Sequence, residues 1–201
     1  MKTQRLVDYL HQQGFPAGAI DGLEARCRKV FQSPIDIKHI LDSYEYDYDW
    51  ERDYVVRSAA SSSEERTLSC INAAALAYAL LGALPEQTRT LLAIHRKDQK
   101  GVECGHVVAL SECQGEVYAL GKSNYPALNR VYGPFPSRHA AATAFGRAYL
   151  SMHFTPLYFG FFDPVNFCSL QTLISSSEPL NGLCDYMMSN YEYAFEIERA
   201  E

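Results

Sequence analysis

An apolar, alanine-rich segment, Ile71–Leu84, constrains the fold of this chain more than any other stretch. Its alanines and leucines go almost all the way round a helical wheel, so a helix here has no polar face to turn toward water. Such a helix lies at the centre of a domain, and its small side chains let strands pack closely against it. Cys70 immediately precedes the segment, after the polar run Ser61–Thr67. We therefore predict a buried central helix with Cys70 at its start, preceded by a mobile loop over Ser58–Ser63 that gates the site.

Cys70 is a candidate nucleophile because of this position. A thiol at the start of a helix meets unpaired backbone N–H groups and the positive end of the helix dipole, and both favour the thiolate. The alternative is a buried structural thiol, which is the commonest fate of a free cysteine. The polar run before Cys70 favours the reactive interpretation.

Two strand-like stretches follow, Val102–Leu110 and Glu116–Leu120, and they form a predicted hairpin. His106 stands at the end of the apolar row of the first strand, and Asn124 comes in the turn after the second. An amide on the adjacent strand can hold an imidazole in the tautomer that faces a sulfur atom. We predict a catalytic group of Cys70, His106 and Asn124. The alternatives are a core histidine and an ordinary turn asparagine.

Two neighbours of Asn124 are candidate supporting groups. If the register differs by one residue, Ser123 or Lys122 takes the place of Asn124. The Lys122 ammonium could in addition stabilise a thiolate or a developing oxyanion.

The remaining elements are predicted from periodicity and from capping signals. We expect helices from Thr3 to near Gly14, over Ala19–Phe31, after Ser33 and over Arg138–Met152, strands at Thr90–His95 and Leu157–Phe162, a charged turn at Arg96–Gly101, and an extended edge with one buried aromatic face at Tyr44–Trp50. A helix packed on a small antiparallel sheet gives an α+β fold. We expect one domain over residues 1–201, with a helical N-terminal part to about residue 50, the cysteine-site core at about 55–170 and a C-terminal helix at 178–201.

Composition limits the function. The net charge is −6 and the Lys and Arg residues are scattered, which disfavours a nucleic-acid partner because phosphate binding needs clustered cations. No stretch approaches the roughly 20 apolar residues that cross a bilayer, so no membrane partner is expected. The N-terminus lacks the apolar core of a signal peptide, and the six scattered cysteines are typical of reduced thiols. A cytoplasmic location is the expectation, with a secreted effector that lacks a signal peptide as the alternative.

Several blocks of the chain resemble a known family. They are Ser69–Leu76, His106–Leu110, Gly121–Leu128 and Pro156–Tyr158. Together they resemble the transglutaminase-like superfamily of the papain-like cysteine fold, and more narrowly an uncharacterised bacterial group within it. The resemblance covers roughly Ser33–Asn166.

The resemblance implies a thiol-dependent hydrolase or acyltransferase without a cofactor or metal. In it Cys70 attacks a carbonyl, His106 shuttles the proton, and Asn124 orients the imidazole. Aspartate is the commoner third residue among transglutaminase-like enzymes, so Asn124 departs from that pattern and gives an imidazolium less electrostatic support. The superfamily contains peptidases, amidases, transglutaminases and inactive members, so the implied substrate is a protein, a peptide or a small amide.

Three other interpretations remain open. Cys104 and His106, with His95 and Cys113 nearby in the sequence, supply ligand types that zinc takes, although their spacing is poor. Cys104 could instead form a reversible disulfide with Cys70. The third interpretation is an inactive member of the same fold that acts as a protein-binding module through its tyrosine-rich acidic stretch.

Overall fold

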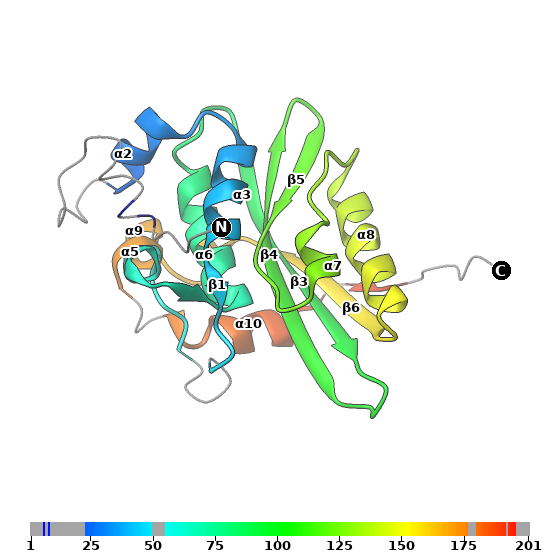
Figure 1. The fold of residues 1–201 in the computed structure, drawn as a ribbon. Coiled ribbons are helices and arrows are strands. Elements are labelled where there is room, and N and C mark those ends of the chain that lie inside the picture. The colour runs from blue at the N-terminus through cyan, green and yellow to red at the C-terminus, as the bar shows by residue number, and fades with distance from the viewer. Residues whose placement is uncertain are drawn as a thin grey trace.

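The computed structural model describes Leu6, Asp8 and residues 23–49, 55–176, 180–191 and 193–195. Figure 1 shows a mixed α+β molecule with helices on both faces of a central sheet. This sheet is five-stranded in the order β5-β4-β3-β6-β7, and every neighbouring pair in it is antiparallel. A separate short parallel pair joins β1 to β2. The predicted α+β class is therefore confirmed.

The elements of the described residues have the following bounds. The strands are β1 (Glu45–Tyr46), β2 (Thr67–Leu68), β3 (Thr88–Lys97), β4 (Glu103–Cys113), β5 (Glu116–Leu120), β6 (Thr155–Phe162) and β7 (Tyr193–Ala194). The helices are α2 (Leu23–Val30), α3 (Pro34–Ser43), α5 (Ala59–Glu64), α6 (Cys70–Leu81), α7 (Pro126–Asn129), α8 (Arg138–Ser151), α9 (Leu170–Ser175) and α10 (Leu183–Ser189), with a 3₁₀ turn, η1, at Pro164–Asn166.

Helix α6 is the buried central helix that the alanine-rich segment predicts. It begins at Cys70, and all its residues are buried. Ser69 caps it, because the Ser69 side chain accepts a hydrogen bond from the backbone N–H of Asn72 at 3.3 Å. The helix packs on β4 and β3 and is itself covered by α3, α5 and α9.

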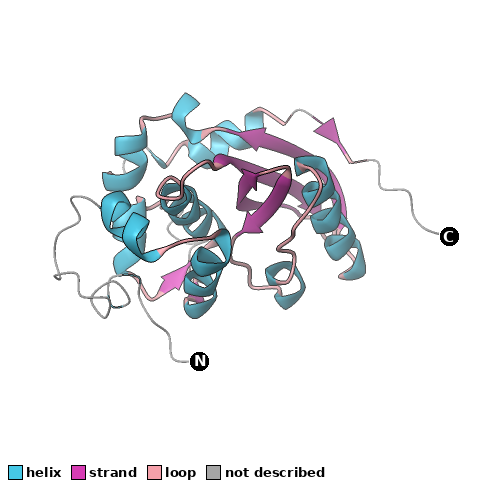
Figure 2. Ribbon diagram, turned by 90° about the horizontal axis from the view of Figure 1, so that it is seen from above, coloured by secondary structure: helices cyan, strands magenta, loops and turns pink. Residues whose placement is uncertain are grey.

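The sheet separates two hydrophobic cores. Val107 and Ala109 of β4 belong to the core around α6, whereas Val108 and Leu110 belong to the core around α8. Alternate side chains of a strand point to opposite faces, so each residue of β3 and β4 is assigned to the α6 face or the α8 face. Figures 1 and 2 show α6 and α8 on opposite sides of the sheet, with β7 at its far edge. This division decides which side chains can meet at a site.

The predicted mobile loop before Cys70 is wrong. Residues 59–64 form α5, which Ser58 caps by accepting a hydrogen bond from the Ser61 N–H at 3.2 Å. Ser62 and Ser63 are buried, and the Ser63 hydroxyl donates to the Ala60 carbonyl at 2.6 Å. Serines that bond to their own backbone can be buried in a short helix, which composition does not reveal.

The tyrosine-rich acidic stretch is only partly a buried edge. Its strand, β1, spans two residues, and Tyr44 before it is 2% exposed whereas Tyr48 after it is 73% exposed. The Tyr44 hydroxyl accepts a hydrogen bond from the Leu6 N–H at 2.8 Å, which holds the N-terminal segment to the core. The predicted buried aromatic face therefore holds for Tyr44, holds in part for the half-buried Tyr46, and is wrong for Tyr48, while Trp50 lies outside the described residues.

The predicted C-terminal helix differs from the structure, and the predicted N-terminal helix is largely outside the described residues. The C-terminal helix is shorter than residues 178–201, because α10 ends at Ser189 and the chain continues into β7, which pairs with Tyr158 and Phe159 of β6. Most of the helix predicted from Thr3 lies outside the described residues. Among the helices that are described, none has the length and apolarity needed to cross a bilayer.

Candidate functional site

Cys70 occupies the first turn of α6 and is 9% exposed. Burial raises the pKa of the Cys70 thiol, while hydrogen bonds from the backbone N–H groups of Val107, Ile71 and Cys70 itself lower it, as does the positive charge of Arg96. Burial is the largest of these effects. The pKa of the Cys70 thiol therefore lies above its ordinary value, although the sulfur lies among groups that stabilise a negative charge once it forms.

The thiol lies against an edge of β4 that none of the described strands covers. Strand β5 pairs with β4 only from Ala109 to Cys113, so β4 has no strand partner on that side before Ala109. The Asp98 N–H donates to the Val102 carbonyl across the turn between β3 and β4. Because backbone groups alternate in direction along a strand, even-numbered residues of β4 point their N–H and C=O groups toward β3, and odd-numbered residues point theirs away from β3. The Val107 N–H thus points out of the open edge toward Cys70. The start of α6 fills the place that β5 leaves.

His106 is buried on the α8 face. It is 4% exposed, and its ring lies against Phe145 and Tyr149 of α8 with centroid distances of 5.9 and 6.3 Å. Burial lowers the pKa of His106 to about 3, and the charge of Arg96 adds to this effect. Among the described residues, no hydrogen bond joins the His106 ring to the Cys70 thiol. The predicted pair is adjacent along β4 through Val107, but its two side chains do not bond in this conformation.

The predicted third residue and its neighbours lie in the loop after β5. Ser123 is buried, and the Asn129 side chain holds it by two hydrogen bonds of 2.8 Å to its backbone, whereas Asn124 is exposed. Lys122 donates to the Asp42 carbonyl at the end of α3 at 3.2 Å, and burial lowers its pKa. Within the described part of the chain, none of these three side chains bonds to Cys70 or His106. Their predicted roles stay predictions.

Arg96 is the residue that sequence reasoning missed. It was expected in a charged turn, but β3 continues to Lys97 and carries Arg96 on the α8 face. Its side chain is buried, with 7% of the residue exposed. Its Nη1 donates to the Gly105 carbonyl at 3.0 Å and to the Tyr149 hydroxyl at 3.3 Å. Period-two alternation with Leu92 and Ile94 was the signal that could have placed it.

Aromatic rings enclose the Arg96 guanidinium. Its central carbon lies 4.7 Å from the Tyr149 ring centroid, 5.0 Å from that of Phe154 and 5.7 Å from that of Tyr125. Its Nε is buried and has no hydrogen-bond partner. No carboxylate of the described residues pairs with it. The arrangement therefore holds a positive charge whose countercharge is absent from the described structure.

Two further groups interact with Cys70, and both are uncharged at neutral pH. Burial raises the pKa of Tyr149 well above its ordinary value, and burial together with the nearby Cys70 raises the pKa of Cys184 to about 12. Tyr149 comes from α8 and Cys184 from α10, so elements from both faces of the sheet reach this edge.

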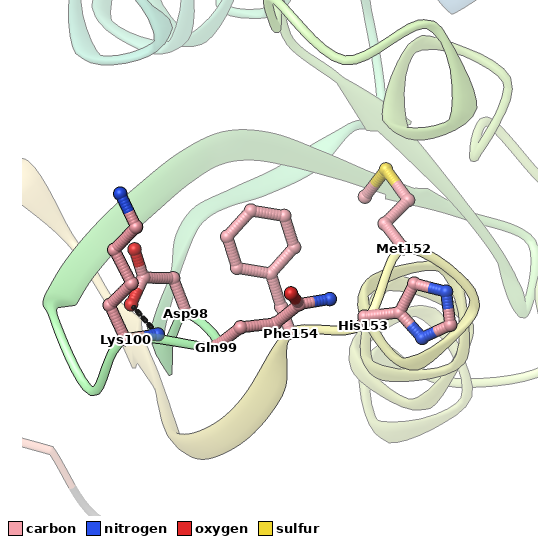
Figure 3. Close-up of a pocket in the computed structure, with 6 residues that line it drawn as sticks. All are labelled: Asp98, Gln99, Lys100, Met152, His153 and Phe154. Carbon is pink, nitrogen blue, oxygen red and sulfur yellow. Dashed lines mark hydrogen bonds between the residues drawn. The ribbon is translucent and has the colours of Figure 1, made fainter.

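A cavity of about 200 Å³ lies elsewhere, between the β3–β4 turn and the turn that links α8 to β6 (Figure 3). It is lined by Asp98, Gln99, Lys100, Met152, His153 and Phe154. Neither Cys70 nor His106 lines it, and the Asp98 carboxylate is already bonded to the backbone N–H groups of Lys100 and Val102 at 2.8 Å. Phe154 connects this cavity with the Arg96 environment, since its ring also lies against the guanidinium.

The zinc interpretation receives no support in the described part of the chain. No group of three or more His, Cys, Asp or Glu side chains there could hold a metal ion. His95 faces the α6 side, where its ring stacks on Tyr191 at 5.6 Å and its Nε2 lies 3.3 Å from a Glu103 oxygen. Cys104 and His106 share the α8 face, so His95 cannot complete a site with them.

A scan against protein-family models finds no match, and a search of curated proteins finds none.

Proposed function

We propose that this protein carries out cysteine-dependent acyl transfer, or hydrolysis of an amide or ester, with Cys70 as the nucleophile. The observation that carries the proposal is the surroundings of one sulfur atom, which combine the start of a buried helix, three backbone N–H groups and a buried guanidinium. Burial still keeps the pKa of Cys70 above its ordinary value, but these groups stabilise the thiolate once it forms, and the thiolate is the reactive form of cysteine.

The reaction follows from these contacts. The Cys70 thiolate attacks the carbonyl carbon and the carbonyl oxygen becomes an oxyanion. When the oxyanion collapses, the carbon–nitrogen or carbon–oxygen bond breaks, the leaving amine or alcohol takes up a proton through His106, and a thioester remains. Water or an amine then attacks the thioester and releases Cys70. The backbone N–H of Cys70 is the nearest donor for the oxyanion, and the Val107 N–H on the open edge of β4 is the second.

His106 and Asn124 keep their proposed roles as proton shuttle and orienting residue. Both roles require the His106 ring to turn from Phe145 and Tyr149 toward the sulfur. The resemblance to the transglutaminase-like superfamily supports this assignment, and it implies a protein, a peptide or a small amide as substrate. Activity of this kind needs free thiols, so a reducing compartment such as the cytoplasm is part of the proposal.

A specific observation favours a second candidate, a binding module without catalysis. His106 packs between aromatic rings, its pKa is lowered to about 3, and Asn124 is exposed. An inactive member of the fold would keep these residues as core and turn. The two candidates differ in whether Cys70 forms a covalent intermediate.

Acylation by an activated ester separates the candidates. The protein is incubated with p-nitrophenyl acetate, quenched in acid, and mapped by peptide mass spectrometry while p-nitrophenolate release is followed. We expect an acetyl group on Cys70 and turnover in wild type and in Cys113→Ala, and neither in Cys70→Ala. Cys113 is the matched control because it is a half-buried thiol at the C-terminal end of β4, whereas Cys70 lies against Val107 earlier in the strand. Equal turnover in Cys70→Ala, or an unmodified Cys70 in wild type, contradicts the catalytic proposal and leaves the binding module.

A further inference from the structure

We propose that Arg96, and not an imidazolium, is the countercharge of the Cys70 thiolate. This inference deepens the proposed function and rests on it for the role of the thiolate in catalysis. The titration of Cys70 can nevertheless be measured without any substrate.

Arg96 carries a buried positive charge that no carboxylate of the described residues neutralises. A guanidinium stays charged in proteins, and burying a charge without an anion is costly. Arg96 is 7% exposed, and its Nη1 bonds to neutral oxygens, those of the Gly105 carbonyl and the Tyr149 hydroxyl. Among the described residues its Nε has no hydrogen-bond partner, and the carboxylate of Glu103, from the same stretch of β4, pairs with Lys97 on the opposite face of the sheet. The structure thus maintains a buried cation with one donor left open.

Arg96 and Cys70 both reach the open edge of β4. The Gly105 carbonyl and the Val107 N–H leave β4 on the same side, because both residues are odd-numbered and β5 covers neither. Arg96 bonds to the first of these groups, and the Cys70 sulfur bonds to the second. The guanidinium therefore reaches across β4 on the α8 face and arrives at the edge where the thiol lies.

Tyr149, Cys184 and His106 around the thiol are uncharged at neutral pH. Tyr149 and Cys184 are protonated at neutral pH because burial raises the pKa of each. His106 is unprotonated because burial and Arg96 lower its pKa to about 3. Asp185 of α10 carries a charge and raises the pKa of Cys184, but among the described residues Arg96 is the charged group that shifts the pKa of Cys70 itself. In the free protein, before the His106 ring turns toward the sulfur, the thiol gives its proton to water and the resulting anion has this one cation to pair with.

The test is the pH dependence of Cys70 alkylation by iodoacetamide, followed by peptide mass spectrometry so that the other cysteines do not interfere. In this reaction the thiolate forms a C–S bond and iodide leaves. The variants are Arg96→Gln, Arg96→Lys and His106→Gln. Arg89→Gln is the matched control, because Arg89 also bonds to a backbone carbonyl, that of Tyr78 at 2.9 Å, and also lies over a tyrosine ring, at 4.6 Å.

We expect the midpoint of the Arg96→Gln profile to move up by about one pH unit or more, since a nearby opposite charge shifts a pKa by roughly 1–3 units. Near neutral pH the alkylation rate then falls about threefold to tenfold, because a more basic thiolate is also a better nucleophile. Arg96→Lys keeps most of the wild-type midpoint, and Arg89→Gln keeps all of it. His106→Gln also keeps it, because a neutral imidazole contributes no charge.

Each outcome decides the inference. An unchanged midpoint in Arg96→Gln overturns it, and so does an upward shift in His106→Gln, which would show an imidazolium pair. If Arg96→Gln does not fold, Arg96→Lys and His106→Gln still decide between the two cations. The acetylation experiment is independent of this one. If Cys70 is acetylated but the midpoint of its alkylation profile is the same in Arg96→Gln, only the inference about Arg96 is refuted. If the midpoint depends on Arg96 but Cys70 is not acetylated, only the proposed function is refuted.

Discussion

At the scale of single residues, the His106 ring lies between the sheet and two aromatic rings of α8. A protonated imidazole in this place would have no described anion to pair with. The sequence context of His106 allowed either a core histidine or a catalytic base, because a histidine at the end of an apolar row fits both. Strand alternation alone indicated that it shares a face with Val108 and Leu110, but not which helix would cover that face. The position of α8 follows from contacts distant in sequence, and for this reason the sequence did not show it.

The burial of His106 makes folding sensitive to acid. Its pKa is about 3 in the folded protein against 6.5 for an ordinary histidine, so the unfolded chain binds the proton more tightly. This contribution to stability is complete above the unfolded pKa and is lost as the pH falls toward the folded one. We expect the free energy of unfolding to decrease by about 2 kcal/mol between about pH 7 and about pH 5 because of His106.

Urea unfolding at a series of pH values measures this effect in wild type and in His106→Gln. The variant should show a correspondingly weaker loss over the same range, whatever its stability near neutral pH. Parallel curves for the two proteins would show that His106 is protonated in the folded state as readily as in the unfolded one.

At the scale of elements, the start of α6 depends on Ser69, as the start of α8 depends on Ser137. Each serine accepts a hydrogen bond from the backbone N–H three residues later, at 3.3 and 3.1 Å. Only the first of these caps adjoins Cys70. Removing each cap in turn therefore distinguishes a general loss of helix stability from a specific loss of thiol reactivity.

We expect Ser69→Ala and Ser137→Ala each to lower the free energy of unfolding by about 1 kcal/mol, as loss of a serine cap usually does. Only Ser69→Ala should also slow Cys70 alkylation, because fraying of the first turn disorders the N–H groups that stabilise the thiolate. Thermal unfolding and the alkylation rate, measured on the same samples, test the pair. Equal alkylation rates in the two variants would mean that the thiolate does not depend on the helix start.

Much of the element pattern could be predicted from the sequence. The β4–β5 hairpin, α6, α8 and β6 occur close to their predicted bounds, because periodicity and capping residues are local signals. Arg96 and α5 were misjudged for a common reason. Charged and serine-rich segments are usually exposed, and only tertiary packing shows that Arg96 is enclosed by rings and that Ser62 is buried.

At the scale of the whole molecule, one sheet supports a core on each face. Ile71 of α6 belongs to the first core and Ile94 of β3 to the second, and both side chains are essentially fully buried. Strands β3 and β4 contribute side chains to both cores. Loss of either core should therefore unfold the sheet that the other core needs.

We expect Ile71→Val and Ile94→Val each to cost roughly 0.5–1.5 kcal/mol and to lower the midpoint of one and the same unfolding transition. Far-ultraviolet circular dichroism and near-ultraviolet tyrosine signals should coincide in both variants. A transition that responds to only one of the substitutions would show that the two faces unfold independently.

The enclosure of Arg96 by Tyr125, Tyr149 and Phe154 has a consequence for the energetics of the proposed reaction. Water must reorient around a charge that appears during a reaction, and this reorganisation is a large part of many barriers. A guanidinium held among rings is already oriented before the thiolate forms. The free energy of fixing it is spent during folding, so the chemical step does not have to supply it.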